Sequence, residues 1–145
     1  MTVEHIDERP TLTALHPEGY VQTPGRTTSS AVRATGVNSI VFLAGQVANS
    51  RDGSFVGRDD LAAQLHQIYR NIGALADAAG TDMSGVVSLR TYLVAHADQD
   101  QYRKAKAALS RHYWPDGRFP TNTMVVVTRL AEAEYLAEIE AVLAC

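Results

Sequence analysis

The clearest pattern in this chain is a helical one between residues 59 and 80. Apolar side chains recur there at steps of three and four, which places them on one stripe of an α-helix: Leu61, Leu65, Ile68, Ile72, Leu75 and Ala79. Asp59 or Asp60 can cap the N-terminus, and Gly80 suits the position after the last turn. A second helix is predicted over Gln101–Trp114, and Pro115 ends it because proline cannot continue a helix.

Shorter segments rich in β-branched and aromatic residues predict the strands. Ala31–Thr35 and Ile40–Ala44 flank a Gly-Val-Asn-Ser sequence, and this arrangement predicts a β-hairpin. Three further strands are expected at Val86–Val94, Thr123–Thr128 and Tyr135–Leu143. The resulting order of elements, ββαβαββ, is typical of an α+β fold with two helices on one face of a mixed sheet.

The first thirty residues show no sustained period of either kind and hold three of the five prolines. We therefore expect an irregular N-terminal arm over residues 1–30, with at most one short strand around Thr11–Leu15. One α+β domain is expected to follow over residues 31–145.

The last two strands predict a sheet with a second face that is only partly polar. One side of the final strand carries only apolar residues and suits packing against helices: Ala137, Ile139, Ala141 and Leu143. Its other side mixes acids with aliphatic residues, and the strand before it is apolar on both sides. Because water would otherwise cover this second face, we expect self-association.

Composition narrows the class of protein. The chain has 145 residues, of which 46% are hydrophobic and 20% charged, as in one soluble domain. The net charge of −3 does not favour binding to nucleic acid or to an anionic membrane surface. No apolar run is long enough to form a transmembrane helix. The start lacks the basic region of a secretory signal, and Cys145 is the single cysteine, so we expect a cytoplasmic protein.

Few residues point to catalytic chemistry. The five histidines are scattered without metal-ligand spacing, so no metal site is expected, and the common nucleotide-loop and serine-hydrolase motifs are absent. Glu138 and Glu140 share one face of the last strand among apolar residues. Partial burial would raise the pKa of such a carboxyl toward the range useful for proton transfer. The alternative is that both form ion pairs with Arg129, Arg90 or a neighbouring subunit.

Four short segments occur in an order that carries a resemblance. They are Ile40–Val47 (IVFLAGQV), Asp77–Gly80 (DAAG), Phe119-Pro120 before a strand, and Arg129-Leu130 followed by Glu138–Ala141 (EIEA). Together they resemble the Rid family, also called YjgF/YER057c/UK114, from about residue 31 to the end. The resemblance implies a chorismate-mutase-like fold assembled as a homotrimer with clefts between subunits. It also implies hydrolysis of reactive imines and enamines to ammonia and a 2-keto acid, without metal or cofactor.

Carried over residue by residue, the resemblance implies a site that departs from the family's pattern. The glutamate that positions the attacking water falls on Glu138, and the glycine of the family's Ser-Gly-Gln triplet is kept as Gly45. The other positions of the cleft hold different residue types. Ala44 replaces the serine, Asn122 replaces the arginine that clamps the substrate carboxylate, and Met124 replaces a frequent cysteine. The position of the family's tyrosine falls near Thr28.

Replacement of the clamp arginine changes the expected substrate. Asparagine offers only neutral hydrogen bonds, whereas arginine holds a carboxylate with two charge-assisted ones. Ordinary 2-imino acids are therefore poor candidate substrates, and a neutral, amide-like or larger apolar ligand fits the site better. Arg90 and Arg118 are candidates for a displaced cation, and Tyr20 is a candidate for the missing aromatic side chain.

Two functions follow from these residues. The first is a specialised imine or enamine hydrolase in which Glu138 acts as general acid/base or positions water. The second is a non-catalytic trimer that uses the same cleft to bind a small metabolite, or its outer surface to bind a partner. Retention of Glu138 favours the first, and the combined loss of arginine, tyrosine and serine favours the second. The acidic balance disfavours ribonuclease activity, for which some family members are named.

Overall fold

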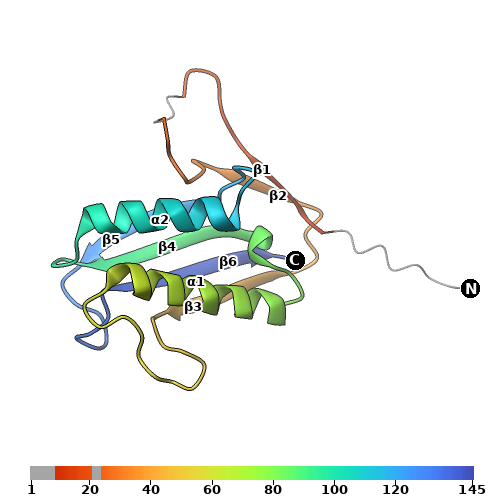
Figure 1. The fold of residues 1–145 in the computed structure, drawn as a ribbon. Coiled ribbons are helices and arrows are strands. Elements are labelled where there is room, and N and C mark those ends of the chain that lie inside the picture. Colours follow the sequence, from red (N-terminus) through yellow and green to blue (C-terminus); the bar gives the residue numbers. More distant parts are fainter. Residues whose placement is uncertain (1–8, 21–23) are drawn as a thin grey trace, which may run out of the picture.

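Two helices cover one face of a four-stranded sheet in the computed structural model, which describes residues 9–20 and 24–145 (Figure 1). The elements in chain order are β1 (Thr11–Ala14), β2 (Val32–Thr35), β3 (Ile40–Gln46), α1 (Leu61–Ala78), the short 3-10 helix η1 (Met83–Gly85), β4 (Val86–Val94), α2 (Gln99–Tyr113), β5 (Thr121–Val127) and β6 (Ala137–Ala144). The predicted α+β architecture, with a mixed sheet and two helices on one face, is confirmed.

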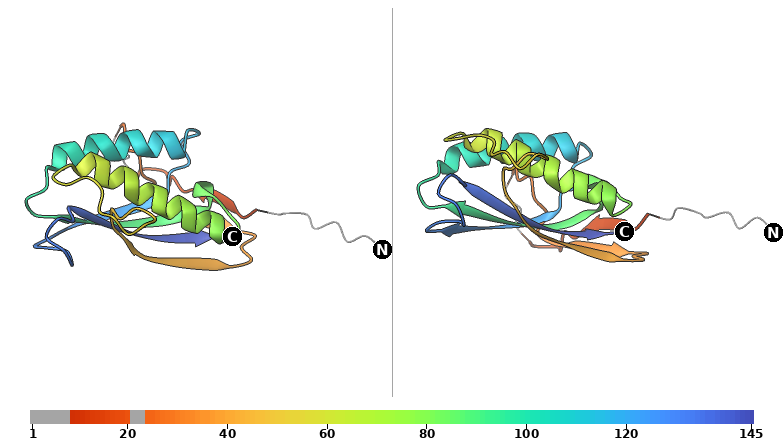
Figure 2. Two further views of the ribbon diagram at one scale, coloured as in Figure 1. Left: turned by 60° about the horizontal axis from the view of Figure 1, so that its bottom comes forward. Right: turned by 90° about the horizontal axis from the view of Figure 1, so that it is seen from below.

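The larger sheet has the strand order β3-β6-β4-β5. Strand β6 runs antiparallel to both of its neighbours, and β4 runs parallel to β5. Strand β6 is therefore central, although it follows all the others along the chain. Figure 2 shows the helices in a layer on one side of the sheet and no helix on the other.

The predicted hairpin between residues 31–35 and 40–44 is wrong. Strand β2 pairs with β1 in a separate two-stranded sheet, and β3 pairs with β6. The connecting residues bond to the C-terminus of the chain, because the amides of Asn38 and Ser39 donate to the carbonyl of Cys145 at 2.7 and 2.9 Å. Strand β3 thus starts beside β6, and β2 pairs with the short strand that was expected around Thr11–Leu15.

The core lies between the helices and the sheet, as the apolar stripes predict. Residues Leu65, Ile68 and Ile72 of α1 are fully buried, and Asp60 caps that helix by accepting from the amide of Ala63 at 3.0 Å. Gly80 closes it in the left-handed region, with a φ of 80°. The inward side of β6 is buried as expected, so burial of apolar area fixes which face of the sheet is left open.

The open face of the sheet carries large apolar side chains. Phe42 is 76% exposed and Ile40 is 58% exposed, both on β3, and Val125 of β5 is also exposed. This agrees with the expectation that a single chain leaves the second face wet. Among the described residues no helix is long and apolar enough to cross a membrane.

Candidate functional site

A bulge in β3 places Gly45 against Glu138 on the open face. Leu43 pairs with Ala141 and Gln46 pairs with Ile139, so β3 uses one residue more than β6 over this stretch. A Cβ atom on Gly45 would overlap the carboxylate of Glu138. Any larger residue here would therefore displace the side chain of Glu138 that lies over it. The structure brings these two predicted site residues together, with Ala44 exposed beside them.

Glu138 is half-buried, and within the described residues no hydrogen bond or ion pair engages its carboxylate. Its neighbour Glu140 is engaged: Tyr92 donates its hydroxyl to Glu140 Oε2 at 3.2 Å, and Arg90 lies 3.5 Å from the same oxygen. The alternative expectation was that both acids form ion pairs, and Glu140 forms one with Arg90. Glu138 is left as the carboxylate that is available to a ligand.

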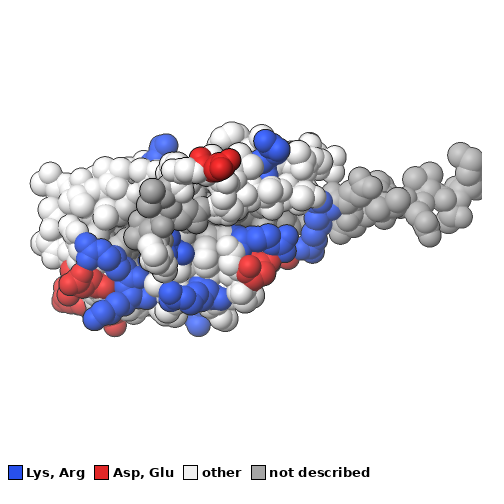
Figure 3. All heavy atoms as spheres, turned by 90° about the horizontal axis from the view of Figure 1, so that it is seen from above, with Lys and Arg blue, Asp and Glu red and all other residues white. Residues whose placement is uncertain are grey.

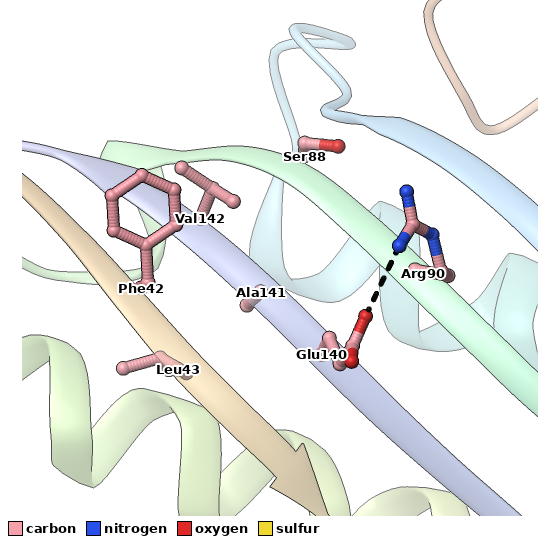
Figure 4. Close-up of a pocket in the computed structure, with 7 residues that line it drawn as sticks. All are labelled: Phe42, Leu43, Ser88, Arg90, Glu140, Ala141 and Val142. Carbon is pink, nitrogen blue, oxygen red and sulfur yellow. Dashed lines mark ion pairs between the residues drawn. The ribbon is translucent and has the colours of Figure 1, made fainter.

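A pocket of about 360 Å³ opens beside the Arg90–Glu140 pair (Figure 4). Arg90 and Ser88 come from β4, and Phe42 faces them from β3 across Val142 of β6. Arg90 lies directly opposite Glu140, and Glu138 lies opposite Tyr92 on the same face. The structure thus places Arg90, one of the candidate cations, on the face of Glu138.

Asn122 lies on the other face of the sheet, at the start of β5. Its Oδ1 accepts from Thr91 Oγ1 at 3.1 Å and its Nδ2 donates to the hydroxyl of Tyr102 at 3.2 Å. Thr91 and Tyr102 are buried, so this amide joins β4, β5 and α2 through the interior. Within one chain, Asn122 and Glu138 therefore point to opposite sides of the sheet.

Two more predicted site residues lie near Asn122. Thr28 donates its hydroxyl to the carbonyl of Pro120 at 3.1 Å, and Ser29 donates its amide to the same carbonyl at 3.0 Å. Met124 follows on the same side of β5 and is 37% exposed. The predicted residues therefore form two groups: Ala44, Gly45 and Glu138 on the open face, and Thr28, Asn122 and Met124 along β5.

The other two candidates do not lie at either group. Arg118 is paired with Asp116, 2.6 Å away, in the turn before β5. Tyr20 is 52% exposed in the N-terminal segment, and its amide donates to the carbonyl of Pro17. In the described ranges, no group of three or more His, Cys, Asp or Glu side chains could hold a metal ion.

Sequence reasoning missed Lys106 of α2. Its Nζ donates to the carbonyl of Thr27, and Thr27 Oγ1 lies 3.2 Å away. Burial lowers the pKa of Lys106 to about 8, and the nearby positive charge of Arg26 adds to this effect. Its place four residues after buried Tyr102 was a usable signal, because residues at that spacing share one face of a helix.

Comparison with known proteins assigns the family. The family described as Endoribonuclease L-PSP matches residues 24–145. The chain belongs to this family, that of the Rid or YjgF/YER057c/UK114 proteins. The Rid family protein YyfB of Yersinia pestis, described as of unknown function, is 30% identical with a TM-score of 0.82, covering 92% of this chain and 98% of that one.

Other relatives agree with this assignment. A YjgF/YER057c/UK114 family member from Mycobacterium tuberculosis is 27% identical, with a TM-score of 0.59 over 93% of this chain and all of that one. A RutC family protein of Pyrococcus horikoshii is 27% identical over 114 residues, 79% of this chain and 83% of that one. The Rid chains with solved structures thus share both the fold and the extent of this protein.

Proposed function

We propose that this Rid protein hydrolyses an imine, enamine or related C=N substrate in a cleft between the subunits of a homotrimer, without a metal or cofactor. The observation that carries the proposal is the half-buried, unpartnered carboxylate of Glu138 above the Gly45 bulge. A carboxylate of this kind is suited to general base catalysis once a substrate and a water molecule lie beside it.

The proposed reaction uses Glu138 to carry two protons in turn. The carboxylate takes a proton from water as the water oxygen bonds to the carbon of the C=N group. The nitrogen receives the electron pair of the C=N bond and takes this proton from the Glu138 carboxyl, which gives a carbinolamine. The carboxylate then removes the hydroxyl proton and passes it to the amine, so that the C–N bond breaks, ammonia leaves and the carbon becomes a carbonyl. We assign to the backbone N–H of Gly45 the role of a donor to a ligand oxygen, where a hydrogen bond stabilises negative charge that develops during the reaction.

A second copy of the chain completes this site in our proposal. The open face exposes the apolar side chains of Phe42 and Ile40 to water. Because this exposure costs free energy, burying them between copies of the chain stabilises an assembly. In one chain the Glu138 group and the Asn122 group point to opposite sides of the sheet. Assembly can bring the first group of one copy to the second group of another.

We infer a substrate range that differs from that of 2-imino acids. Asn122 stands at the position of the clamp arginine, and both ends of its amide are already bonded to Thr91 and Tyr102. It therefore supplies no free cation for a carboxylate next to the C=N carbon. We place this activity in the cytoplasm, on the basis of the single cysteine.

One alternative is supported by a specific observation. Ala44 has no hydroxyl group and the amide of Asn122 is engaged inside the subunit, so fewer polar groups face a ligand than in the family's pattern. This favours a non-catalytic trimer that binds a small metabolite or a partner. In that case Glu138 contributes binding only.

The test is a coupled assay of ammonia and keto acid release from freshly generated 2-iminopropionate, 2-iminobutyrate and a neutral imine. We expect wild type to prefer the neutral imine and Glu138→Gln to lose about a hundredfold or more of that activity. Glu132→Gln, a change of the same type outside the strands, is the matched control and should retain activity. Asn122→Arg should shift preference toward the 2-imino acids. Silence of wild type on every imine would favour the binding function.

A further inference from the structure

Lys106 is a half-buried cation that lacks an acidic partner among the described residues. Two of its three N–H donors are used by the carbonyl and hydroxyl oxygens of Thr27. No ion pair reaches it within residues 9–20 and 24–145. A buried charge held only by neutral groups costs free energy that a bound anion would recover.

A second positive charge lies close by. Arg26 is exposed, immediately precedes Thr27, and is near enough to disfavour the charged form of Lys106, whose pKa falls to about 8 mainly through burial. In the described part of the chain, no ion pair engages the Arg26 guanidinium either. Two cations held together without an acid attract an anion, since an anion relieves their mutual repulsion.

The backbone around these cations is fixed to the β5 end of the candidate site. Ser29 donates its amide to the carbonyl of Pro120 at 3.0 Å and pairs with Thr121 in an isolated parallel bridge. Lys106 lies one turn after Tyr102, whose hydroxyl accepts from Asn122. The cations are therefore held near the position that lacks the clamp arginine.

Space for a ligand adjoins this segment. A pocket of about 280 Å³ is lined by Arg26, Thr28, Gly25 and His16, among other residues. Figure 3 looks onto the side of the molecule that carries the N-terminal segment, where Lys and Arg side chains are spread widely and Asp and Glu gather at fewer places. A ligand in this pocket can present an anionic group to the guanidinium of Arg26.

We propose that Lys106 and Arg26, with the hydroxyl of Thr27, form the binding site for an anionic group, a carboxylate or a phosphate, of the substrate. This inference rests on the proposed function, because it assigns the anion to the substrate of the same cleft. The substrate class it names is an imine or enamine that is uncharged next to its C=N carbon, as proposed above, and that carries an anionic group further away, where these two cations hold it.

The test measures thermal unfolding and calorimetric binding of the full chain with 2-oxobutyrate and with inorganic phosphate, at constant ionic strength made up with chloride. We expect one of these anions to raise the melting temperature of wild type, and the stronger of the two identifies the group. Lys106→Met keeps the side-chain stem and should weaken binding at least about tenfold, as a charged hydrogen bond is lost. Lys104→Met, an exposed change two residues away on α2, is the matched control.

The outcomes separate this inference from a purely structural role of Lys106. Arg26→Gln alters an exposed side chain and should also weaken anion binding while leaving the unliganded melting temperature unchanged. Absence of any anion-specific stabilisation of wild type would overturn the site, and so would anion binding by Lys106→Met and Arg26→Gln as tight as that of wild type. Glu138→Gln should bind the anion like wild type. If the protein binds the anion but hydrolyses no imine, the proposed hydrolase function alone is contradicted. If it hydrolyses an imine but binds no anion, this anion site alone is contradicted.

Discussion

At Gly45, the addition of a single Cβ atom would change the geometry of the site. A methyl group there would overlap the Glu138 carboxylate, which lies at the end of a flexible side chain and can swing away. Gly45→Ala should therefore lower hydrolysis on the order of a hundredfold, because a misplaced catalytic group is nearly as costly as a missing one. The melting temperature should change little.

The measurement for Gly45 is a double-mutant cycle in the imine assay. Gly45→Ala should cause no further loss in a Glu138→Ala background, since the two changes remove the same group. Gly73→Ala is the control: its new methyl group on α1 meets Met83 of η1 at ordinary contact distance, so activity should be retained. Additive losses at Gly45 and Glu138 would contradict the contact.

Lys106 is also expected to shape the pH dependence of stability. Its pKa is about 8 in the folded chain, below its ordinary value of 10.5, so the unfolded chain binds more protons between these values. The free energy of unfolding should therefore rise as pH increases from about 8 to 10.5. Urea unfolding at several pH values should show this rise in wild type and lose it in Lys106→Met. An identical pH profile in both proteins would be inconsistent with a desolvated lysine.

At the scale of the elements, Gln64 fastens α1 to the segment that enters β6. It is fully buried, its Nε2 donates to the carbonyls of Gly57 and Glu134 at 2.9 Å, and its Oε1 accepts from the amide of Leu136 at 2.8 Å. Gln64→Leu should reduce the free energy of unfolding by about 2–5 kcal/mol, because three backbone groups lose their partner. Chemical denaturation measures this loss.

The control for Gln64 lies one turn along the same helix. Gln67 is only part-buried, and its amide donates to Asn71 Oδ1 at 2.9 Å. Gln67→Leu should cost well under half as much, as expected for a hydrogen bond that water can replace. Equal losses from the two substitutions would mean that Gln64 contributes through its volume and not through its hydrogen bonds.

Elements set by local periodicity could be predicted from the sequence, and pairing between distant strands could not. The stripe through Leu65, Ile68 and Ile72 identifies α1 because a helix repeats every 3.6 residues. The wrong hairpin arose because a four-residue connection fits two outcomes, and the residue that decides between them, Cys145, is far along the chain. The same limit explains why Lys106 was missed. In the sequence it resembles a solvated helix residue, and its contact with Thr27 joins segments that are far apart along the chain.

At the scale of the whole molecule, the exposed apolar side chains of the open face predict a trimer. Wild type should sediment at three times the 15.7 kDa of one chain. Phe42→Glu should dissociate the assembly and abolish hydrolysis, since it places a charge on a face that the assembly buries. Leu75→Glu, at an exposed apolar residue of α1, should leave the assembly intact. A single-chain mass for wild type would contradict the inter-subunit cleft.

The central place of β6 in the sheet has a consequence for biosynthesis. Strands β3 and β4 do not pair with each other and are joined only by β6, which follows both along the chain. At about 5–20 residues per second, a ribosome needs several seconds to go from Gln46 to Ala137. During that interval β3, and also β4 once it has been made, lack their shared partner strand. Attachment of β3 to the rest of the sheet is thus deferred until β6 has been made, and a chain that still lacks β6 exposes unpaired strands that a chaperone can protect from aggregation.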